Sequence, residues 1–292
     1  MRAVRVHELG GTPQVDDVEP PSAPGLVRVV TGALNPVDVT IANGRFWGGT
    51  PDFPYVVGSE VVGTRDGRRV WVRGRQLLQE LVDPAGAWVF DVPAGVDDAT
   101  ALACGVAGLT AWLAVSWRAP VRPDDTVLVL GASGTLGRVA VQGAKVLGAG
   151  RVIGAARRPE LVPPAADDVV DLTAGGDLPP ASLIIDALWA EPLERALAAA
   201  PNGVRVVQIG QSAGPEARLQ SGWVRGKMAD ILGLTLFTAP EDVAASGYRQ
   251  LCEHARDGRI AIETESYPLE QVAEAWARQA SGSPGAKIVL TL

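Results

Sequence analysis

The sequence of 292 residues predicts an α/β protein in which a small β-barrel or sandwich is joined to a doubly wound parallel sheet. Three observations predict this architecture. The first hundred residues are rich in Gly, Pro and Val and contain only short β-like runs, and from about Asp98 the chain becomes Ala-rich and helical. Beyond Thr126, strand-like and helix-like segments alternate. Such alternation is typical of βαβ units and therefore of a parallel sheet.

Composition excludes several classes of protein. Hydrophobic residues make up 47% and charged residues 20%, which excludes disorder over the whole length. With 26 basic and 33 acidic residues the net charge is −7, so we expect no nucleic acid and no membrane as partner. No apolar stretch approaches the roughly 18–20 residues of a membrane span. The opening, MRAVRVHELGGTP, is typical of a first strand, and the two cysteines, Cys104 and Cys252, favour the reducing cytoplasm.

The N-terminal part is predicted from short apolar runs separated by turn signals such as Asn43-Gly44 and Asp66-Gly67. The runs are Val27–Thr31, Val56–Gly63 and Arg69–Val72. An Ala-rich helical stretch through Trp117 then leads into Thr126–Leu130, an unbroken apolar run of the kind that is buried in parallel sheets.

The rest of the chain supplies the alternating elements. Strands are predicted at Arg151–Ala155, Val169–Leu172, Ser182–Asp186, Val204–Gly210, Ile231–Phe237 and Ala286–Leu292. Helices are predicted over Gly137–Gly148, Pro192–Ala200, Glu241–Asp257 and Leu269–Ala280. Pro192 lies in the first turn of its helix, where proline is favourable, and Gly258 and Gly282 end the last two helices.

The most informative segment is the glycine-rich loop in Thr126–Gly137, TVLVLGASGTLG. A buried strand ends at Gly131, and a helix opens directly after two further glycines, which permits a tight turn and a close approach of a pyrophosphate to the helix N-terminus. The predicted cofactor-binding residues here are Gly131, Ser133, Gly134, Thr135, Leu136 and Gly137. The alternative is a tight strand-to-helix turn without a ligand.

The end of the next strand predicts which dinucleotide binds. Proteins that bind NAD place Asp or Glu at this point to hold the ribose 2′-hydroxyl, whereas this chain has Arg157 and Arg158. Two guanidiniums suit a 2′-phosphate and therefore favour NADP(H), although a solvated pair of surface arginines is the alternative. Ile209 and Gly210, at the end of a later strand, complete the cofactor site that we predict on this sheet.

Four segments, in this order, resemble the medium-chain dehydrogenase/reductase superfamily in its zinc-free quinone oxidoreductase branch. They are GALNPVDVTIANG with FPYVVGSEVVG, ALACGVAGLTAWLAV, VLVLGASGTLGRVAVQGAKVLGA and YPLEQVAEAWARQASGSPGAKIVLTL. The resemblance implies a GroES-like β-barrel domain over 1–105, completed by 260–292, and a Rossmann doubly wound parallel sheet domain over 106–259. It also implies a homodimer through the run Ile231–Phe237, whose alternative is a monomer in which Thr238–Val243 covers that edge.

A metal site is not expected. Zinc-dependent relatives need a cysteine early in the barrel, a histidine in a G-H-E motif and a further cysteine. Here the first is absent, the motif is Gly58-Ser59-Glu60, and Cys104 lacks partners.

The resemblance implies hydride transfer to a quinone or an α,β-unsaturated carbonyl compound. Asn35 and Thr110 match positions near the nicotinamide, and Asn35 would donate a hydrogen bond to substrate or ribose unless it only forms a turn before Pro36. Thr40 and Phe46 stand where many relatives have tyrosines, so the proton would come from water or from Thr40.

An apolar substrate pocket is predicted from four side chains: Phe46, Trp47, Leu236 and Phe237. Their alternative role is core filling. The sequence therefore predicts an NADPH-dependent reductase of a small molecule. The alternatives are a biosynthetic enoyl reductase and a cofactor-binding relative with altered or no redox chemistry, acting as a sensor or structural protein.

Overall fold

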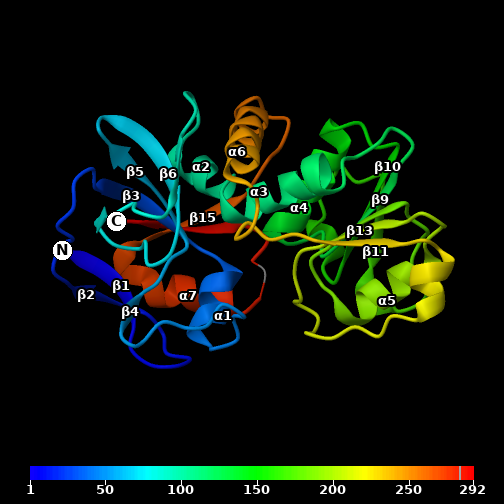
Figure 1. Ribbon diagram of the computed structural model, residues 1–292, viewed down its shortest axis with the longest axis horizontal. Helices are drawn as coiled ribbons and strands as arrows, with labels where there is room; N and C mark the ends of the chain where they lie inside the picture. Colours follow the sequence, from blue (N-terminus) through cyan, green and yellow to red (C-terminus); the bar gives the residue numbers. More distant parts are fainter. Residues whose placement is uncertain (283) are drawn as a thin grey trace. The chain divides into compact units, whose positions relative to one another are not determined.

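The computed structural model describes residues 1–282 and 284–292, and the chain forms two compact units (Figure 1). Unit 1 contains Met1–Ala107, Tyr248–Arg256 and Ile262–Leu292, and unit 2 contains Gly108–Gly247 and Asp257–Ala261. The α-helices are α1 (Pro36–Ala42), α2 (Asp98–Ala103), α3 (Val106–Leu113), α4 (Thr135–Val146), α5 (Ala190–Ala199), α6 (Glu241–Arg256) and α7 (Val272–Ala280). No described helix combines the length and the apolar character that a membrane span requires.

Unit 1 is built from two antiparallel-rich sheets. The smaller has the strand order β2-β1-β4, and the larger has the order β15-β16-β3-β5-β6-β8, with β7 also paired to β3. The strands are β1 (Arg2–Val6), β2 (Gln14–Asp17), β3 (Val27–Leu34), β4 (Tyr55–Val56), β5 (Glu60–Arg65), β6 (Arg68–Arg73), β7 (Leu81–Val82), β8 (Trp88–Asp91), β15 (Thr264–Pro268) and β16 (Lys287–Thr291).

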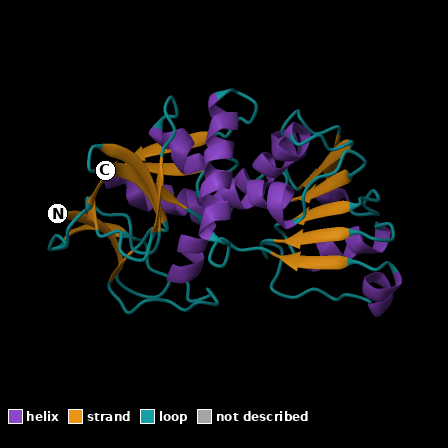
Figure 2. Ribbon diagram, turned by 45° about the horizontal axis from the view of Figure 1, so that its top comes forward, coloured by secondary structure: helices purple, strands orange, loops and turns teal. Residues whose placement is uncertain are grey.

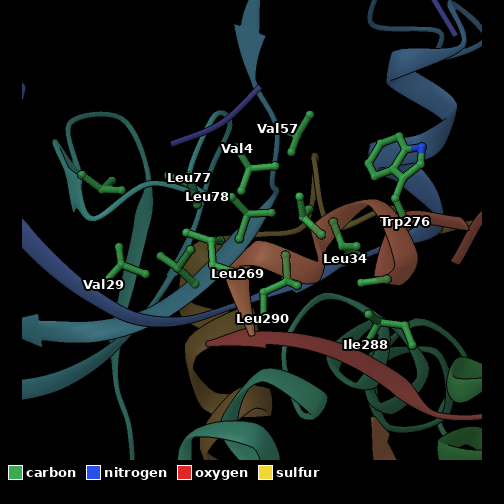
Figure 3. Close-up of a cluster of buried hydrophobic side chains, with 14 of the residues drawn as sticks. Val4, Val29, Leu34, Val57, Leu77, Leu78, Leu269, Trp276, Ile288 and Leu290 are labelled. Atoms are coloured by element: carbon green, nitrogen blue, oxygen red, sulfur yellow. The ribbon is translucent and has the colours of Figure 1, made fainter. Parts of the chain in front are cut away.

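The C-terminal segment completes unit 1. β16 pairs antiparallel with β3, so that Ile288 lies opposite Leu34. The two residues are fully buried in one core with Val4, Leu269 and Trp276, which Figure 3 shows as a single cluster of side chains. A core of this kind is stabilised by removing apolar surface from water, so both ends of the sequence contribute to one hydrophobic interior.

The expected strand Val56–Gly63 is wrong in one respect, because it is two strands. β4 pairs with β1 in the small sheet, whereas β5 begins at Glu60 in the large sheet. Gly58 separates them with φ of +104°, and a Cβ at this residue would lie 2.9 Å from the backbone N of Leu78. Only glycine tolerates this backbone conformation and this close approach, so the chain changes sheet here.

Unit 2 contains a six-stranded parallel sheet of the order β11-β10-β9-β12-β13-β14 (Figure 2). Its strands are β9 (Thr126–Leu130), β10 (Arg151–Ala156), β11 (Asp168–Asp171), β12 (Leu183–Asp186), β13 (Arg205–Gln208) and β14 (Asp230–Gly233). The chain runs outward from β9 in one direction and from β12 in the other, so the order reverses between these two strands. This doubly wound sheet and the barrel-type sheets of unit 1 confirm the predicted fold class.

A buried ion pair joins the amino ends of β9 and β13, the two strands on either side of β12. Arg205 at the start of β13 donates to both carboxylate oxygens of Asp125, which directly precedes β9, at 2.8 and 2.6 Å. Although burial alone raises the pKa of Asp125, hydrogen bonds from Arg205 and Ser182 lower it below its usual range. The charged pair holds β13 in register with β9, the strand that carries the glycine-rich loop, across the intervening β12.

The expected last strand of this sheet, Ile231–Phe237, is also too long. β14 ends at Gly233 because its partner β13 ends at Gln208, the residue opposite Gly233. Leu236 and Phe237 follow in a turn, where Leu236 is buried. β14 is an edge strand, and Arg118 donates to the carbonyl of its Gly233 at 2.9 Å.

Candidate functional site

The glycine-rich loop lies at the carboxyl end of β9, where the strand order reverses. The backbone N–H groups of Gly131 and Ala132 donate to the carbonyl of Ala155 in β10, at 2.9 and 3.0 Å. Gly134 donates back to Gly131 at 3.1 Å and is the N-cap of α4. Ligands of open α/β sheets bind at this kind of position, in front of the first turn of a helix.

Gly137 shows why the loop requires glycine. A Cβ at this residue would lie 2.2 Å from the carbonyl oxygen of Gly131 and 2.7 Å from Cα of Ala132. α4 therefore packs directly against the loop backbone, and the unpaired N–H groups of its first turn, which include those of Thr135 and Leu136, stay close to the loop. These groups and the positive end of the helix dipole fit a pyrophosphate.

The two arginines follow the neighbouring strand at the same sheet edge. β10 ends at Ala156, and Ala155 in β10 lies opposite Leu130 in β9, the residue before the loop. Arg157 is exposed and Arg158 is half-buried. The structure therefore places both arginines directly after the strand that binds the loop, and their contact with a dinucleotide's ribose stays a prediction.

Asp186, which the sequence reasoning missed, lies on the other side of the loop. It ends β12 opposite Leu130 and is fully buried. Its Oδ1 accepts from the backbone N–H groups of Leu188 and Trp189, both at 2.9 Å, whereas Oδ2 has no hydrogen-bond partner among the described residues. Burial raises the pKa of this carboxyl to about 6. A carboxylate that ends an apolar strand is the sequence signal that could have identified it.

The predicted residues Ile209 and Gly210 lie next to Asp186. Their N–H groups donate to its carbonyl oxygen at 2.8 and 3.4 Å. Trp189 has φ of +61° and ψ of −162°, a backbone conformation that side chains other than hydrogen disfavour. Asp186 stabilises this strained turn by accepting from its N–H group, so the carboxyl ends of β12 and β13 form one connected edge.

In unit 1, Asn35 belongs to a buried polar cluster of five residues: Asn35, Asp38, Ser59, Glu60 and Lys287. Asn35 is the N-cap of α1, and its amide donates to Oγ of Ser59 at 3.0 Å and to Oε1 of Glu60 at 2.9 Å. Its Oδ1 accepts from Nζ of Lys287. Both amide hydrogens are therefore used inside the cluster, and a contact of Asn35 with substrate or ribose stays a prediction.

Glu60 and Lys287 form the charged centre of the cluster. Nζ of Lys287 donates to Oε1 of Glu60, and both side chains are almost completely buried. The other carboxylate oxygen of Glu60 accepts from Nε1 of Trp71 and from the backbone N–H of Val106, both at 2.8 Å. The sequence reasoning missed this pair, although a charged residue inside an apolar strand, as in SEVVG and AKIVL, is the signal for one.

Asp38 is the most perturbed group of the cluster. Burial raises the pKa of its carboxyl to about 7, against the lowering effect of the Asn35 backbone hydrogen bond and of the Lys287 charge. Its Oδ2 accepts from N of Asn35 at 2.8 Å and from Oγ of Ser59 at 3.3 Å. The cluster therefore holds a carboxyl group that changes protonation state near neutral pH.

The other predicted residues are distributed over both units. Thr40 in α1 donates its hydroxyl hydrogen to the carbonyl of Pro36 at 2.8 Å. Phe46 and Trp47 pack ring against ring at 5.1 Å, with Phe46 buried and Trp47 75% exposed. Thr110 is a buried residue of α3. Leu236 and Phe237 belong to unit 2, so a pocket shared with Phe46 and Trp47 stays a prediction.

No metal centre is visible in the described part of the chain, where no three His, Cys, Asp or Glu side chains are grouped as ligands. Cys104 and Cys252 are both buried free thiols. At the position where the G-H-E motif would supply a ligand, Ser59 instead hydrogen-bonds Asn35 and Asp38.

Comparisons with known proteins agree with this geometry. A family model described as a zinc-binding dehydrogenase matches residues 164–290. The quinone oxidoreductase of Lama guanicoe is 30% identical, with 100% of this chain and 98% of that protein covered. A phenolphthiocerol/phthiocerol polyketide synthase component of Mycobacterium tuberculosis is 28% identical over 99% of this chain, which spans only 14% of that protein. The quinone oxidoreductase of Thermus thermophilus, solved also with NADPH, has a TM-score of 0.82 and 27% identity, with both chains covered completely.

The raised pKa of Asp38 predicts a pH-dependent stability. The folded state binds the proton of the Asp38 carboxyl more tightly than the unfolded chain does. The protonated carboxyl therefore stabilises the folded state fully below about pH 4, and this stabilisation is lost as the pH rises towards about 7. Asp38→Asn removes this titration. We expect the variant to gain stability relative to the parent as the pH rises from about 5 to about 8, measured by urea unfolding. A difference that stays constant over this range, as expected for the exposed control Asp17→Asn, would contradict the prediction.

Proposed function

The chain belongs to the quinone oxidoreductase-like branch of the medium-chain dehydrogenase/reductase superfamily, and we propose that it is an NADPH-dependent oxidoreductase. Its substrate in this proposal is a quinone or an α,β-unsaturated carbonyl compound. The observation that carries the proposal is the close packing of α4 on the glycine-rich loop at the reversal of the strand order, where Gly137 excludes any side chain. The Thermus relative, which was solved with NADPH, supports the identity of the cofactor.

In this proposal, different residues of unit 2 bind different parts of the cofactor. The loop from Gly131 to Gly137 and the first turn of α4 hold the pyrophosphate, and Arg157 and Arg158 hold the 2′-phosphate. Ile209 and Gly210 line the same edge beside Asp186, whose buried carboxyl keeps the strained turn at Trp189 in place. NADPH, when bound, supplies the hydride for the reduction.

The substrate side of the proposal rests on unit 1. The exposed ring of Trp47, packed against the buried Phe46, presents an apolar face that suits a conjugated ring or alkene. Water supplies the proton, because the Thr40 hydroxyl hydrogen is already donated within α1. The buried polar cluster fixes the N-terminus of α1 and thereby the loop that carries the two rings.

We propose further that no metal takes part. In place of a divalent ion, the ammonium group of Lys287 supplies the positive charge that Glu60 requires. Two further hydrogen bonds from Trp71 and Val106 complete the coordination of that carboxylate. A metal at this point would have to displace a cation that is part of the chain, at a large cost in buried charge.

A second candidate function is that of a biosynthetic enoyl reductase. The observation that favours it is the similarity to the polyketide synthase component over almost the whole of this chain. In this case the acceptor is an alkene conjugated to a thioester, whereas the cofactor and the residues that hold it are unchanged.

The assay that tests the proposed function follows NADPH absorbance with quinones, enones and enoyl thioesters. We expect consumption of NADPH with a quinone or enone, with the same rate before and after dialysis against a strong chelator. Turnover with thioesters alone would assign the second function. Cofactor binding without any turnover would contradict both and favour a sensor or structural protein, and loss of activity on chelation would contradict the metal-free mechanism.

The two arginines predict the preference for NADPH over NADH. Each charge-assisted bond to the 2′-phosphate contributes about 1.5–3 kcal/mol, or roughly ten- to a hundredfold in affinity. Arg157→Ala/Arg158→Ala should weaken NADPH binding by at least this factor and leave NADH binding unchanged, as measured by fluorescence titration. The control Arg151→Ala, at the start of β10, should behave as the parent does. Equal affinity of the parent for the two cofactors would reject this assignment.

We propose a homodimer that pairs the outer edge of β14 with its copy. The N–H of Leu234 donates to Gln208 of β13, so by alternation the N–H of Ile231 points away from the sheet. Ile231→Pro should therefore dissociate the dimer and leave the fold intact, because proline is tolerated on a free strand edge. Light scattering should give about twice 30.4 kDa for the parent. A parent mass of one chain would contradict the dimer and indicate that the Arg118 contact to Gly233 is part of a monomer's covered edge.

A further inference from the structure

An arginine lies directly beside the two aromatic rings of unit 1. A Cβ placed on Gly48 would lie 2.5 Å from Cε1 of Phe46 and 3.4 Å from Nη2 of Arg75. Arg75 and Phe46 therefore flank the same residue, next to Trp47. Arg75 is exposed, and no described carboxylate lies within ion-pair distance of it. An apolar ring surface and an uncompensated guanidinium thus meet at one place.

A second arginine extends this positive surface. Arg73 ends β6 and lies over the ring of Trp88, 4.9 Å from its centroid. Burial lowers the pKa of Arg73, and the charge of Arg75 lowers it further, which indicates that the two guanidiniums are near one another. The nearby acid, Glu60, already accepts four hydrogen bonds, one of them from Lys287.

The backbone holds the segment that carries both arginines in a fixed position. Gly74 donates to the carbonyl of Ser59, and Leu77 donates to that of Gly58, both at 3.1 Å. Gln76 between them has φ of +59°. Arg73, at the end of β6, and Arg75, in the loop after it, therefore belong to a segment that is bonded to the one that supplies Ser59 and Glu60 to the buried polar cluster. A backbone that is already held in place loses less conformational freedom when its side chains bind an anion.

We propose that the substrate carries an anionic group, a carboxylate, sulfonate or phosphate, beside its conjugated ring or alkene, and that Arg75, assisted by Arg73, binds it. This inference rests on the proposed function, since it assigns Phe46 and Trp47 to the substrate. The rings contact the conjugated part, and the guanidiniums hold the charged end. In a chain with a net charge of −7, such a local positive surface selects anions against the overall field.

Two matched acceptors test the proposal: naphthoquinone and its sulfonate. Arg75→Ala should lower kcat/KM for the sulfonate roughly tenfold, chiefly through KM, and change the value for the neutral quinone less than about twofold. Arg75→Lys should restore part of the loss, and rising salt should reduce the difference between the acceptors. Arg68→Ala is the control, because Arg68 lies at the start of β6, the strand that precedes the Arg75 loop, and pairs with Asp91.

The outcomes separate this proposal from the proposed function. Equal losses with both quinones, or weaker NADPH binding in Arg75→Ala, would overturn the role of Arg75 in substrate recognition. If neither these quinones nor any enone is reduced, the proposed function fails, and binding of the two quinones is then followed by tryptophan fluorescence. Tighter binding of the sulfonate that Arg75→Ala abolishes would still support the anion site, and equal binding of both compounds would overturn it.

Discussion

The buried ion pair between Lys287 and Glu60 is the contact on which the organisation of unit 1 depends. Each charge inside the protein would be strongly destabilising without the other. The pair therefore forces β16 and β5 into one arrangement, in which Asn35, Trp71 and Val106 also find their hydrogen-bond partners. Apolar residues of similar volume would fill the space, but they would not specify which strands meet there. The value of the pair lies in this specificity more than in stability.

The same arrangement connects packing to chemistry. Because Asn35 caps α1 and Ser59 precedes β5, the cluster holds the start of α1 against the segment that carries Glu60. Residues that follow α1 supply Phe46 and Trp47, and the loop after β6 supplies Arg75 to the same place. The proposed substrate surface lies on loops that are held by a charged group in the core, so its shape depends on contacts that the substrate would not touch.

The strand, loop and helix start of the proposed cofactor half could be predicted from the sequence because their signals are local. The run TVLVLGASGTLG contains strand, turn and helix start in adjacent residues, and Arg157 directly follows the next strand. The substrate half could not be predicted to the same degree. Lys287 and Glu60 are separated by 227 positions, and no local sequence signal indicates that the two side chains form a pair. Thr40 matches a family position, yet only the structure shows that its hydroxyl is donated to Pro36.

The predicted bounds of two strands are wrong for related reasons. The run Val56–Gly63 has the valine-rich composition of one strand, but Gly58 turns the chain from one sheet into another. The run Ile231–Phe237 has the composition of a long strand, but a strand extends only as far as its neighbour does, and β13 ends at Gln208. The hydrophobic pattern indicates that a segment can form a strand, whereas the length of the strand depends on how far the neighbouring strand extends beside it.

The pairing of β3 with β16 also has a consequence for the order of events during synthesis. A ribosome adds about 5–20 residues per second, so β16 is made roughly ten to fifty seconds after β3. During that interval one edge of β3 has no paired strand, and the apolar core of unit 1 lacks the side chains of Ile288 and Leu290. The sheet of unit 2, whose strands all lie between residues 126 and 233, is complete well before then. The nascent chain therefore passes through a stage in which a finished parallel sheet is attached to an open barrel, and at this stage its unpaired strand edge and apolar side chains are most exposed to aggregation.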